Sequence, residues 1–89
     1  MTLAPSADTT GPIVVDLRPM IPPERHATVF AALDALAPGA IFVLINDHAP
    51  TPLLRRIEER WPDQFSVEFL REGPEVWQVA ITRRAAEAV

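Results

Sequence analysis

The sequence predicts an α/β (α+β) two-layer sandwich, in which a four-stranded mixed sheet carries two helices on one face. Three observations predict this fold. Four short segments show the β-branched or alternating pattern of strands, two segments place apolar residues at helical spacing, and proline or glycine residues separate them. The resulting order is βαβαββ. Because crossover connections are right-handed, the first three strands are expected to run parallel, and the closing hairpin makes the fourth antiparallel.

The composition fits one small domain and excludes several classes of function. Of the 89 residues 48% are hydrophobic, which is enough for a core. The net charge of −4 disfavours a nucleic-acid partner, which would need clustered basic residues. The chain has no cysteine, so it offers no thiol nucleophile, disulfide or thiolate metal ligand. No apolar run approaches the roughly 20 residues that span a bilayer, so no membrane contact is expected and the protein is predicted to be soluble and cytoplasmic.

The domain is predicted to cover residues 13–83, between an N-terminal disordered tail (residues 1–12) and a C-terminal tail (residues 84–89). The first strand is expected over residues 13–17, with Ile13, Val15 and Leu17 on one face.

The first helix is expected to begin at Pro22 or Pro23 and to end near Leu36, before Pro38-Gly39. Its apolar face contains the following residues at helical spacing: His26, Val29, Phe30, Leu33, Leu36 and Ala37.

The second helix is introduced by Pro50 and Pro52 and is expected to end near Trp61. Its charged residues are expected to face solvent, and they are Arg55, Arg56, Glu58 and Glu59.

The remaining strands are predicted at residues 41–45, 65–69 and 76–82. The strand at 41–45 is apolar at every position, as in strands that are covered on both faces. Either neighbouring side chains shield its outer face, or the open face of the sheet meets a partner or a second copy of the chain in a homodimer.

Polar residues follow the predicted strands at the edge where the carboxyl ends of parallel strands meet. Such edges commonly hold ligands, and His26, Asp47, His48 and Glu75 are therefore expected to be neighbours. The candidate ligand-binding residues are Arg18, Glu24, Arg25, His26, Asn46, Asp47, His48, Glu75 and Trp77.

Two chemical interpretations of this edge remain open. The first is a transition-metal site, because imidazole and carboxylate groups are suitable ligands for such metals. Its ligands would be His26, Asp47 and His48, with Glu24 or Glu75 as a further carboxylate. The structural alternative is that Asp47 and Glu24 cap the two helices and the histidines make local hydrogen bonds or packing contacts.

Other polar and aromatic residues also have structural explanations. Asp16 and Arg18 are expected to form an ion pair. Arg25 is expected either to bind an anionic ligand or to be a solvated or ion-paired surface arginine. Trp61 and Trp77 are expected in the core.

The segment 16–24 resembles the TusA (SirA-like) sulfur carriers, whose first strand ends in an Asp-x-Arg-Gly-Leu-x-Cys-Pro-x-Pro motif. Asp16 and Arg18 match that motif, whereas Pro22 occupies the position of the catalytic cysteine and Arg25 that of the second proline. The resemblance implies the same βαβαββ sandwich. It does not imply persulfide transfer, because that reaction needs a thiolate.

Three motifs resemble a bacterial family catalogued as domain of unknown function twenty-two forty-nine. They are Pro-Pro-Glu-Arg-His at 22–26, Asn-Asp-His-x-Pro-x-Pro-Leu at 46–53 and Gly-Pro-x-x-Trp at 73–77. Members of that family resemble TusA-like domains without the cysteine and often accompany hemerythrin-like or respiratory redox proteins, which implies a redox or respiratory context.

The sequence therefore predicts a non-enzymatic module that binds a protein partner or a small ligand at the carboxyl edge of the sheet. A metal-binding domain using His26, Asp47 and His48 is the second hypothesis. An enzyme subunit with His26 and Asp47 as an acid–base pair is the third, since no Ser-His-Asp order, glycine-rich phosphate loop or HExxH pattern occurs.

Overall fold

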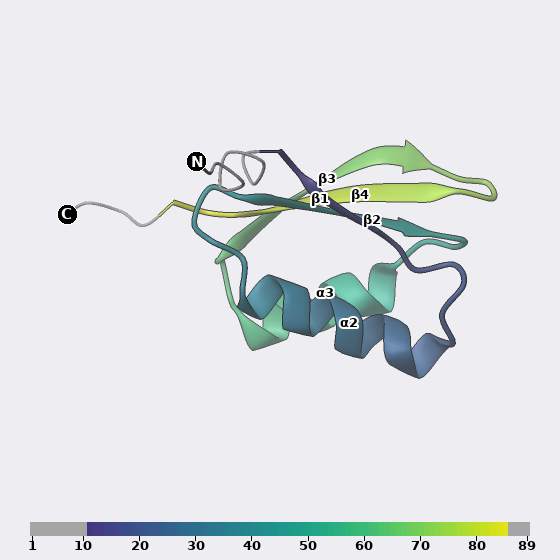
Figure 1. Ribbon diagram of the computed structural model, residues 1–89, viewed down its shortest axis with the longest axis horizontal. Helices are drawn as coiled ribbons and strands as arrows, with labels where there is room; N and C mark the ends of the chain where they lie inside the picture. The colour runs from purple at the N-terminus through teal and green to yellow at the C-terminus, as the bar shows by residue number, and fades with distance from the viewer. Residues whose placement is uncertain (1–10, 86–89) are drawn as a thin grey trace, which may run out of the picture.

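The computed structural model describes residues 11–85, and a sheet forms one layer while two helices form the other (Figure 1). The elements are β1 (Ile13–Asp16), α2 (Pro22–Asp34), β2 (Ile41–Asn46), α3 (Thr51–Arg60), β3 (Phe65–Glu72) and β4 (Trp77–Arg83). The predicted fold class and element order are confirmed. Most of the predicted tails, residues 1–12 and 84–89, fall outside the described residues. Within those residues, no helix is long and apolar enough to cross a membrane.

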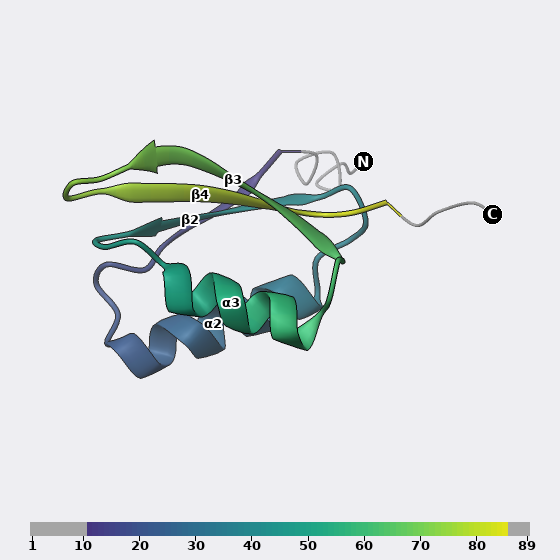
Figure 2. The ribbon, with the colours of Figure 1, turned by 180° about the vertical axis from the view of Figure 1, so that it is seen from behind.

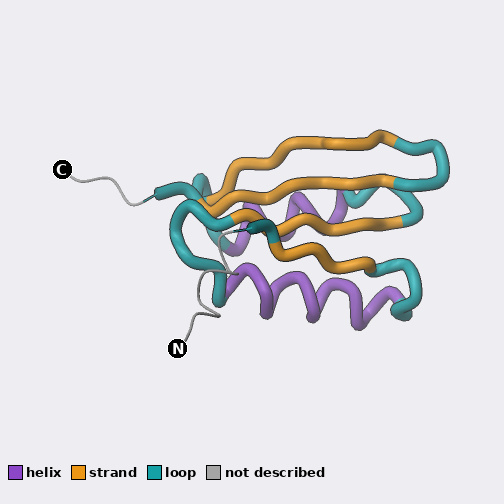
Figure 3. Tube along the Cα trace, turned by 45° about the horizontal axis from the view of Figure 1, so that its top comes forward, coloured by secondary structure: helices purple, strands orange, loops and turns teal. Residues whose placement is uncertain are grey.

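The strand order β1-β2-β4-β3 brings the loops that follow β1, β2 and β3 to one edge of the sheet. β1 and β2 pair in parallel, and β4 lies antiparallel between β2 and β3. Trp77, the first residue of β4, is paired with Asn46 on one side and Glu72 on the other. The ends of β1, β2 and β3 therefore meet the start of β4, and we call this the carboxyl edge (Figure 3).

The core lies between the sheet and the helices, which both cover the same face (Figure 2). In β2 the side chains alternate, because Phe42 and Leu44 are fully buried toward the helices while Val43 and Ile45 point to the other face. Burying each large apolar side chain contributes about 1.5–3 kcal/mol. The fully buried residues of the core are Leu17, Val29, Leu33, Phe42, Leu44, Val79 and Ile81.

An aromatic stack closes the core at the end of α3. Trp61 is only 7% exposed, and its ring lies 5.5 Å from that of Phe30 and 5.4 Å from that of Phe65. Such tilted and edge-on pairs are favourable beyond the area they bury. The predicted core position of Trp61 is therefore confirmed, and the stack ties α2 to α3 and β3.

The open face of the sheet is partly shielded. Val43 is half-buried between Val14 and Ala80, its partners on the neighbouring strands. At the margins, however, Val14 is 58% exposed and Ile41 is 37% exposed. Neighbouring side chains therefore cover only the centre of this face, and a homodimer or partner contact there stays a prediction.

The first helix is shorter than predicted. It ends at Asp34, with Ala35 as its C-cap, so Ala37 follows the helix and is exposed instead of extending the buried stripe. Leu36 is still buried, because the chain turns back toward the sheet after the helix. Gly39 lies in this turn with a φ of 83°, a conformation that glycine adopts without strain.

The Gly-Pro-x-x-Trp motif builds the β3–β4 hairpin. Trp77 is half-buried rather than in the core, and its Nε1–H donates to the carbonyl oxygen of Pro74 at 3.3 Å. Its ring covers Gly73, where an added Cβ would lie 2.8 Å from the ring, and the φ of Gly73 is 69°. Only glycine satisfies both conditions.

Replacing Gly73 by Ala is predicted to lower the free energy of unfolding by about 2–4 kcal/mol, because a left-handed conformation and a clash with Trp77 add together. Gly39→Ala is the matched control, since Gly39 has positive φ but nothing within 4 Å of an added Cβ. It should cost only about 1 kcal/mol. Urea denaturation measures both values, and equal losses would contradict the packing of Trp77 on Gly73.

Candidate functional site: a pocket at the carboxyl edge

Arg25 joins the two loops of the carboxyl edge and uses every N–H of its guanidinium. Its Nε donates to the carbonyl oxygen of Met20 at 2.8 Å, and Nη2 donates to that of Arg18 at 3.1 Å, both in the β1–α2 loop. Nη1 donates to Oδ1 of Asn46 at 2.8 Å and of Asp47 at 3.0 Å, and Nη2 also donates to Oδ2 of Asp47 at 3.2 Å. We call this set of five hydrogen bonds the Arg25 clasp. Arginine suits the role because its donors form a rigid planar fork.

Asn46 is the buried end of the clasp. It is the last residue of β2, and at 4% exposure it is the one polar residue that is buried among residues 11–85. Its Oδ1 accepts from Arg25, and its Nδ2 donates to the carbonyl oxygen of His48 at 3.2 Å. Because an unpaired buried amide is costly, Asn46 fixes both the guanidinium and the first turn of the β2–α3 loop.

Asp47 is held between two donors. Its carboxylate accepts from Arg25 and, at 2.7 Å, from Nδ1–H of His48. The hydrogen bonds from Arg25, and secondly from His48, lower the pKa of Asp47 from 3.8 to about 2. The carboxylate is therefore charged at neutral pH, and its charge balances that of Arg25.

The predicted capping roles of Asp47 and Glu24 are wrong. The N-cap of α3 is Pro50 and that of α2 is Ile21, and neither helix has a side-chain cap hydrogen bond. Asp47 lies too early in the loop and is already bound to Arg25. Glu24 lies in the first turn of α2, where its charge still favours the helix dipole.

Asp16 and Arg18 form the expected ion pair at the end of β1. Nε and Nη2 of Arg18 donate to the two carboxylate oxygens at 2.9 and 2.7 Å. The side-chain hydrogen bond from Arg18 lowers the pKa of Asp16 to about 2, aided by the backbone N–H of Arg18. Both side chains are about 40% exposed (42% and 39%), so this pair stabilises the protein little.

Beside the clasp lies a cavity of about 60 Å³, which we call the edge pocket. It has room for a few water molecules or a small polar group. Its ionisable wall residues are Arg25, His26 and His48, and no acidic residue lines it. The complete lining is Leu17, Pro22, Arg25, His26, Asn46, His48, Pro50, Pro52 and Leu53.

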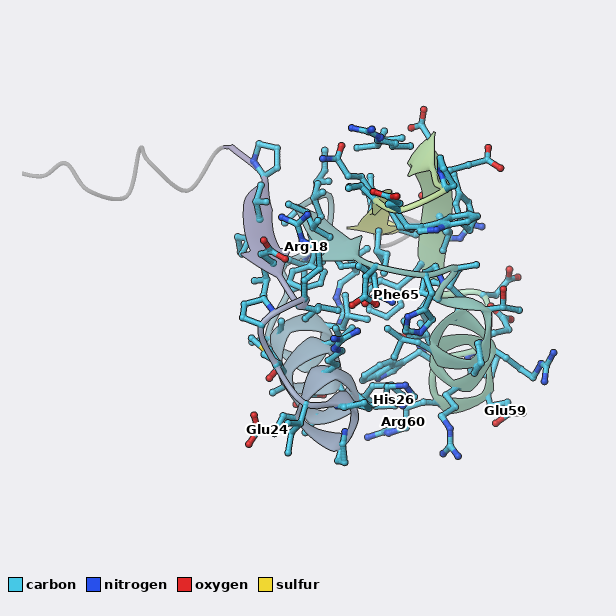
Figure 4. The ribbon with its side chains drawn as sticks, turned by 90° about the vertical axis from the view of Figure 1, so that its right-hand side faces the viewer. Arg18, Glu24, His26, Glu59, Arg60 and Phe65 are labelled. Carbon is cyan, nitrogen blue, oxygen red and sulfur yellow. The ribbon has the colours of Figure 1, made fainter. Side chains whose placement is uncertain are left out.

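The edge pocket unites only part of the predicted site. Its wall includes Arg25, His26, Asn46 and His48. Asp47 binds Arg25 and His48 but does not line the pocket. The other candidates, Arg18, Glu24, Glu75 and Trp77, do not contribute to its wall. Figure 4 shows His26 reaching from α2 into the space beside α3, while Glu24 points away from it.

The expected metal-ligand set is not assembled in this structure. Among residues 11–85, no three or more His, Cys, Asp or Glu side chains are grouped so that they could hold a metal ion. Asp47 is engaged by Arg25 and His48 instead, and it does not line the pocket.

A second, shallower hollow of about 270 Å³ lies between α2 and α3, and we call it the interhelical groove. It is lined by His26, Ala27, Phe30 and Arg56. Arg56 is expected from the sequence on the solvent side of α3, and no sequence pattern identifies this groove. Finding it requires the distance between the helices, which helical periodicity does not supply.

The sequence of this domain matches the model of a known protein family over nearly its whole described length. Residues 14–83 match the model of a family described as an uncharacterized conserved protein, DUF2249. The chain belongs to the DUF2249 family. No curated protein and no solved structure matches it. The match spans β1 to the end of β4, so the Arg25 clasp and both hollows are parts of the DUF2249 domain.

In this DUF2249 domain the substitution Arg25→Met is predicted to lower the free energy of unfolding by about 2–4 kcal/mol, because Asn46 loses its buried partner. Arg18→Met is the control, since its ion pair is exposed and local, and it should cause no change beyond measurement error. Urea denaturation compares the two variants. Equal losses would mean that the clasp is no more important than a surface ion pair.

The lowered pKa of Asp47 predicts a specific dependence on pH. The folded protein favours the deprotonated form of this carboxylate more than the unfolded chain does. The contribution of Asp47 to the free energy of unfolding is therefore complete above about pH 4, the ordinary aspartate pKa. It is lost as the pH falls toward 2. Asp47→Asn should therefore lower the melting temperature at pH 6, and its difference from wild type should close between pH 4 and 2. A difference that stays constant over this range would contradict the pairing.

Proposed function

We propose that this DUF2249 domain is a non-enzymatic module that binds a small carboxylate ligand in the edge pocket. The observation that carries the proposal is the kind of ionisable residue that lines the pocket. The chain has twelve acidic and eight basic residues, yet each ionisable residue of the wall is an arginine or a histidine. Asp47 balances the charge of Arg25, so the wall offers a ligand its two histidines and the amide of Asn46, with no carboxylate among its lining residues. A wall without a carboxylate favours a small anion over a cation.

The Arg25 clasp supports a division of roles within the wall. All N–H groups of Arg25 are engaged by protein acceptors, so Arg25 holds the wall in place rather than grasping the ligand. The Nδ1–H of His48 is likewise bound to Asp47. Nε2 of His48 and the ring of His26 are therefore the groups left to meet a ligand.

The composition of the wall supports binding rather than catalysis. No serine, threonine, cysteine, aspartate or glutamate lines the edge pocket, so its wall carries no hydroxyl, thiol or carboxylate nucleophile. A bound carboxylate would meet hydrogen-bond donors and proline rings, which orient it without reacting with it.

Titration with sodium acetate, followed by NMR of the two imidazole rings at pH 6, tests this function. We expect saturable shifts of both rings with a Kd of about 1–10 mM, which is typical for so few ligand atoms. His26→Ala and His48→Ala should each weaken binding at least about fivefold, roughly 1 kcal/mol.

Two controls separate a specific site from general charge attraction. Arg55→Gln removes a charge from an exposed position of α3 that does not line the pocket, and it should leave the Kd unchanged. Acetamide, the neutral isostere, should not shift the rings. Rings that do not respond to acetate, or respond equally to acetamide, would refute the proposal.

A further inference from the structure

The edge pocket and the interhelical groove meet at one residue. His26 lines both hollows, since it projects from the first turns of α2 into the space beside α3 (Figure 4). A ligand whose carboxylate lies against His26 and His48 therefore has the groove as the adjoining space for the rest of its structure.

The chemistry of the groove suits a flat apolar group. Ala27 and Phe30 form its α2 side, and the ring of Phe30 is held in place by Trp61, 5.5 Å away at an angle of 41°. Aromatic rings pack favourably on such a supported ring in offset or tilted arrangements. The α3 side is Arg56, and a guanidinium is attracted to the face of an aromatic ring.

The charges of the groove agree with those of the pocket. Its ionisable residues are His26 and Arg56, and no acidic side chain lines it. A second carboxylate on the ligand is not required, because Arg56 can lie over a ring while the single carboxylate stays between the imidazoles.

We infer that the ligand class of this site is an aromatic monocarboxylate, with its carboxylate in the edge pocket and its ring in the interhelical groove between Phe30 and Arg56. The inference rests on the proposed function and adds the chemical class of the group attached to the carboxylate. It also gives the groove a role that the edge pocket alone does not explain.

Benzoate, acetate and benzamide are the probes that test it on the full chain. Benzoate should bind at least about tenfold more tightly than acetate, a difference of about 1.4 kcal/mol. Benzamide keeps the ring but loses the charge, so it should bind at least about tenfold more weakly than benzoate. The amide signals of Ala27 and Phe30 should shift with benzoate and not with acetate.

A groove-filling variant locates the ring. Ala27 is exposed on α2, so Ala27→Leu should fold normally while occupying the groove, and it should reduce the benzoate-to-acetate affinity ratio from about ten toward about one. Ala35→Leu, the same change at an exposed position near the end of α2 that does not line the groove, should leave the ratio unchanged.

The outcomes separate this inference from the function beneath it. Acetate and benzoate binding with equal affinity would overturn the aromatic inference and leave the carboxylate site standing. A benzoate preference that survives Ala27→Leu would also overturn it, because the ring would then lie elsewhere. Failure of both anions to bind would refute the proposed function and the inference together.

Discussion

The guanidinium of Arg25 is the constraint on which the carboxyl edge depends. It joins residues that are 22 positions apart in sequence, on two loops that could each adopt many conformations, and ordering a loop costs conformational entropy. Arg25 offsets this cost by binding two backbone carbonyls of the β1–α2 loop and the side chains of Asn46, at the end of β2, and Asp47, in the loop that follows. With a side chain only 11% exposed, its hydrogen bonds are stronger than those of a surface ion pair.

The clasp also determines the electrostatics of the site. Asp47 is the one acidic residue of the Asn-Asp-His sequence, and its carboxylate binds Arg25 and His48 without lining the pocket itself. Arg25 and Asn46 also line the cavity, but they are bound to each other, which leaves the imidazoles of His26 and His48 as the groups of the proposed ligand site. The carboxylate that would complete a histidine metal site is therefore bound to Arg25, and the proposed ligand site rests on the histidines that remain.

Much of the fold could be predicted because it follows from periodicity. The alternation in β2 and the helical stripe containing Val29 and Leu33 each reflect which side of an element meets the core. The convergence of His26 and His48 on one pocket could also be predicted, since the topology brings the start of α2 and the end of β2 to the same edge.

The remaining features depend on contacts that no local pattern encodes. The sequence pattern places Asp47 at the N-terminus of α3, but the helix begins only at Thr51, with Pro50 as its N-cap. The strong donor that Asp47 meets is Arg25, on another element. Periodicity places Arg56 on the solvent side of α3, where it is indeed exposed, but only the distance between the helices shows that it also lines the groove. Pairings of this kind depend on distances between elements.

Hydrogen exchange of the arginine Nε–H groups tests the clasp most directly, because each guanidinium reports its own environment. The Nε–H of Arg25 is bound to the carbonyl oxygen of Met20 and shielded from solvent, and it should exchange much more slowly than that of Arg18, which is bound to an exposed carboxylate. An Arg25 Nε–H that exchanges as fast as that of Arg18 would contradict the account.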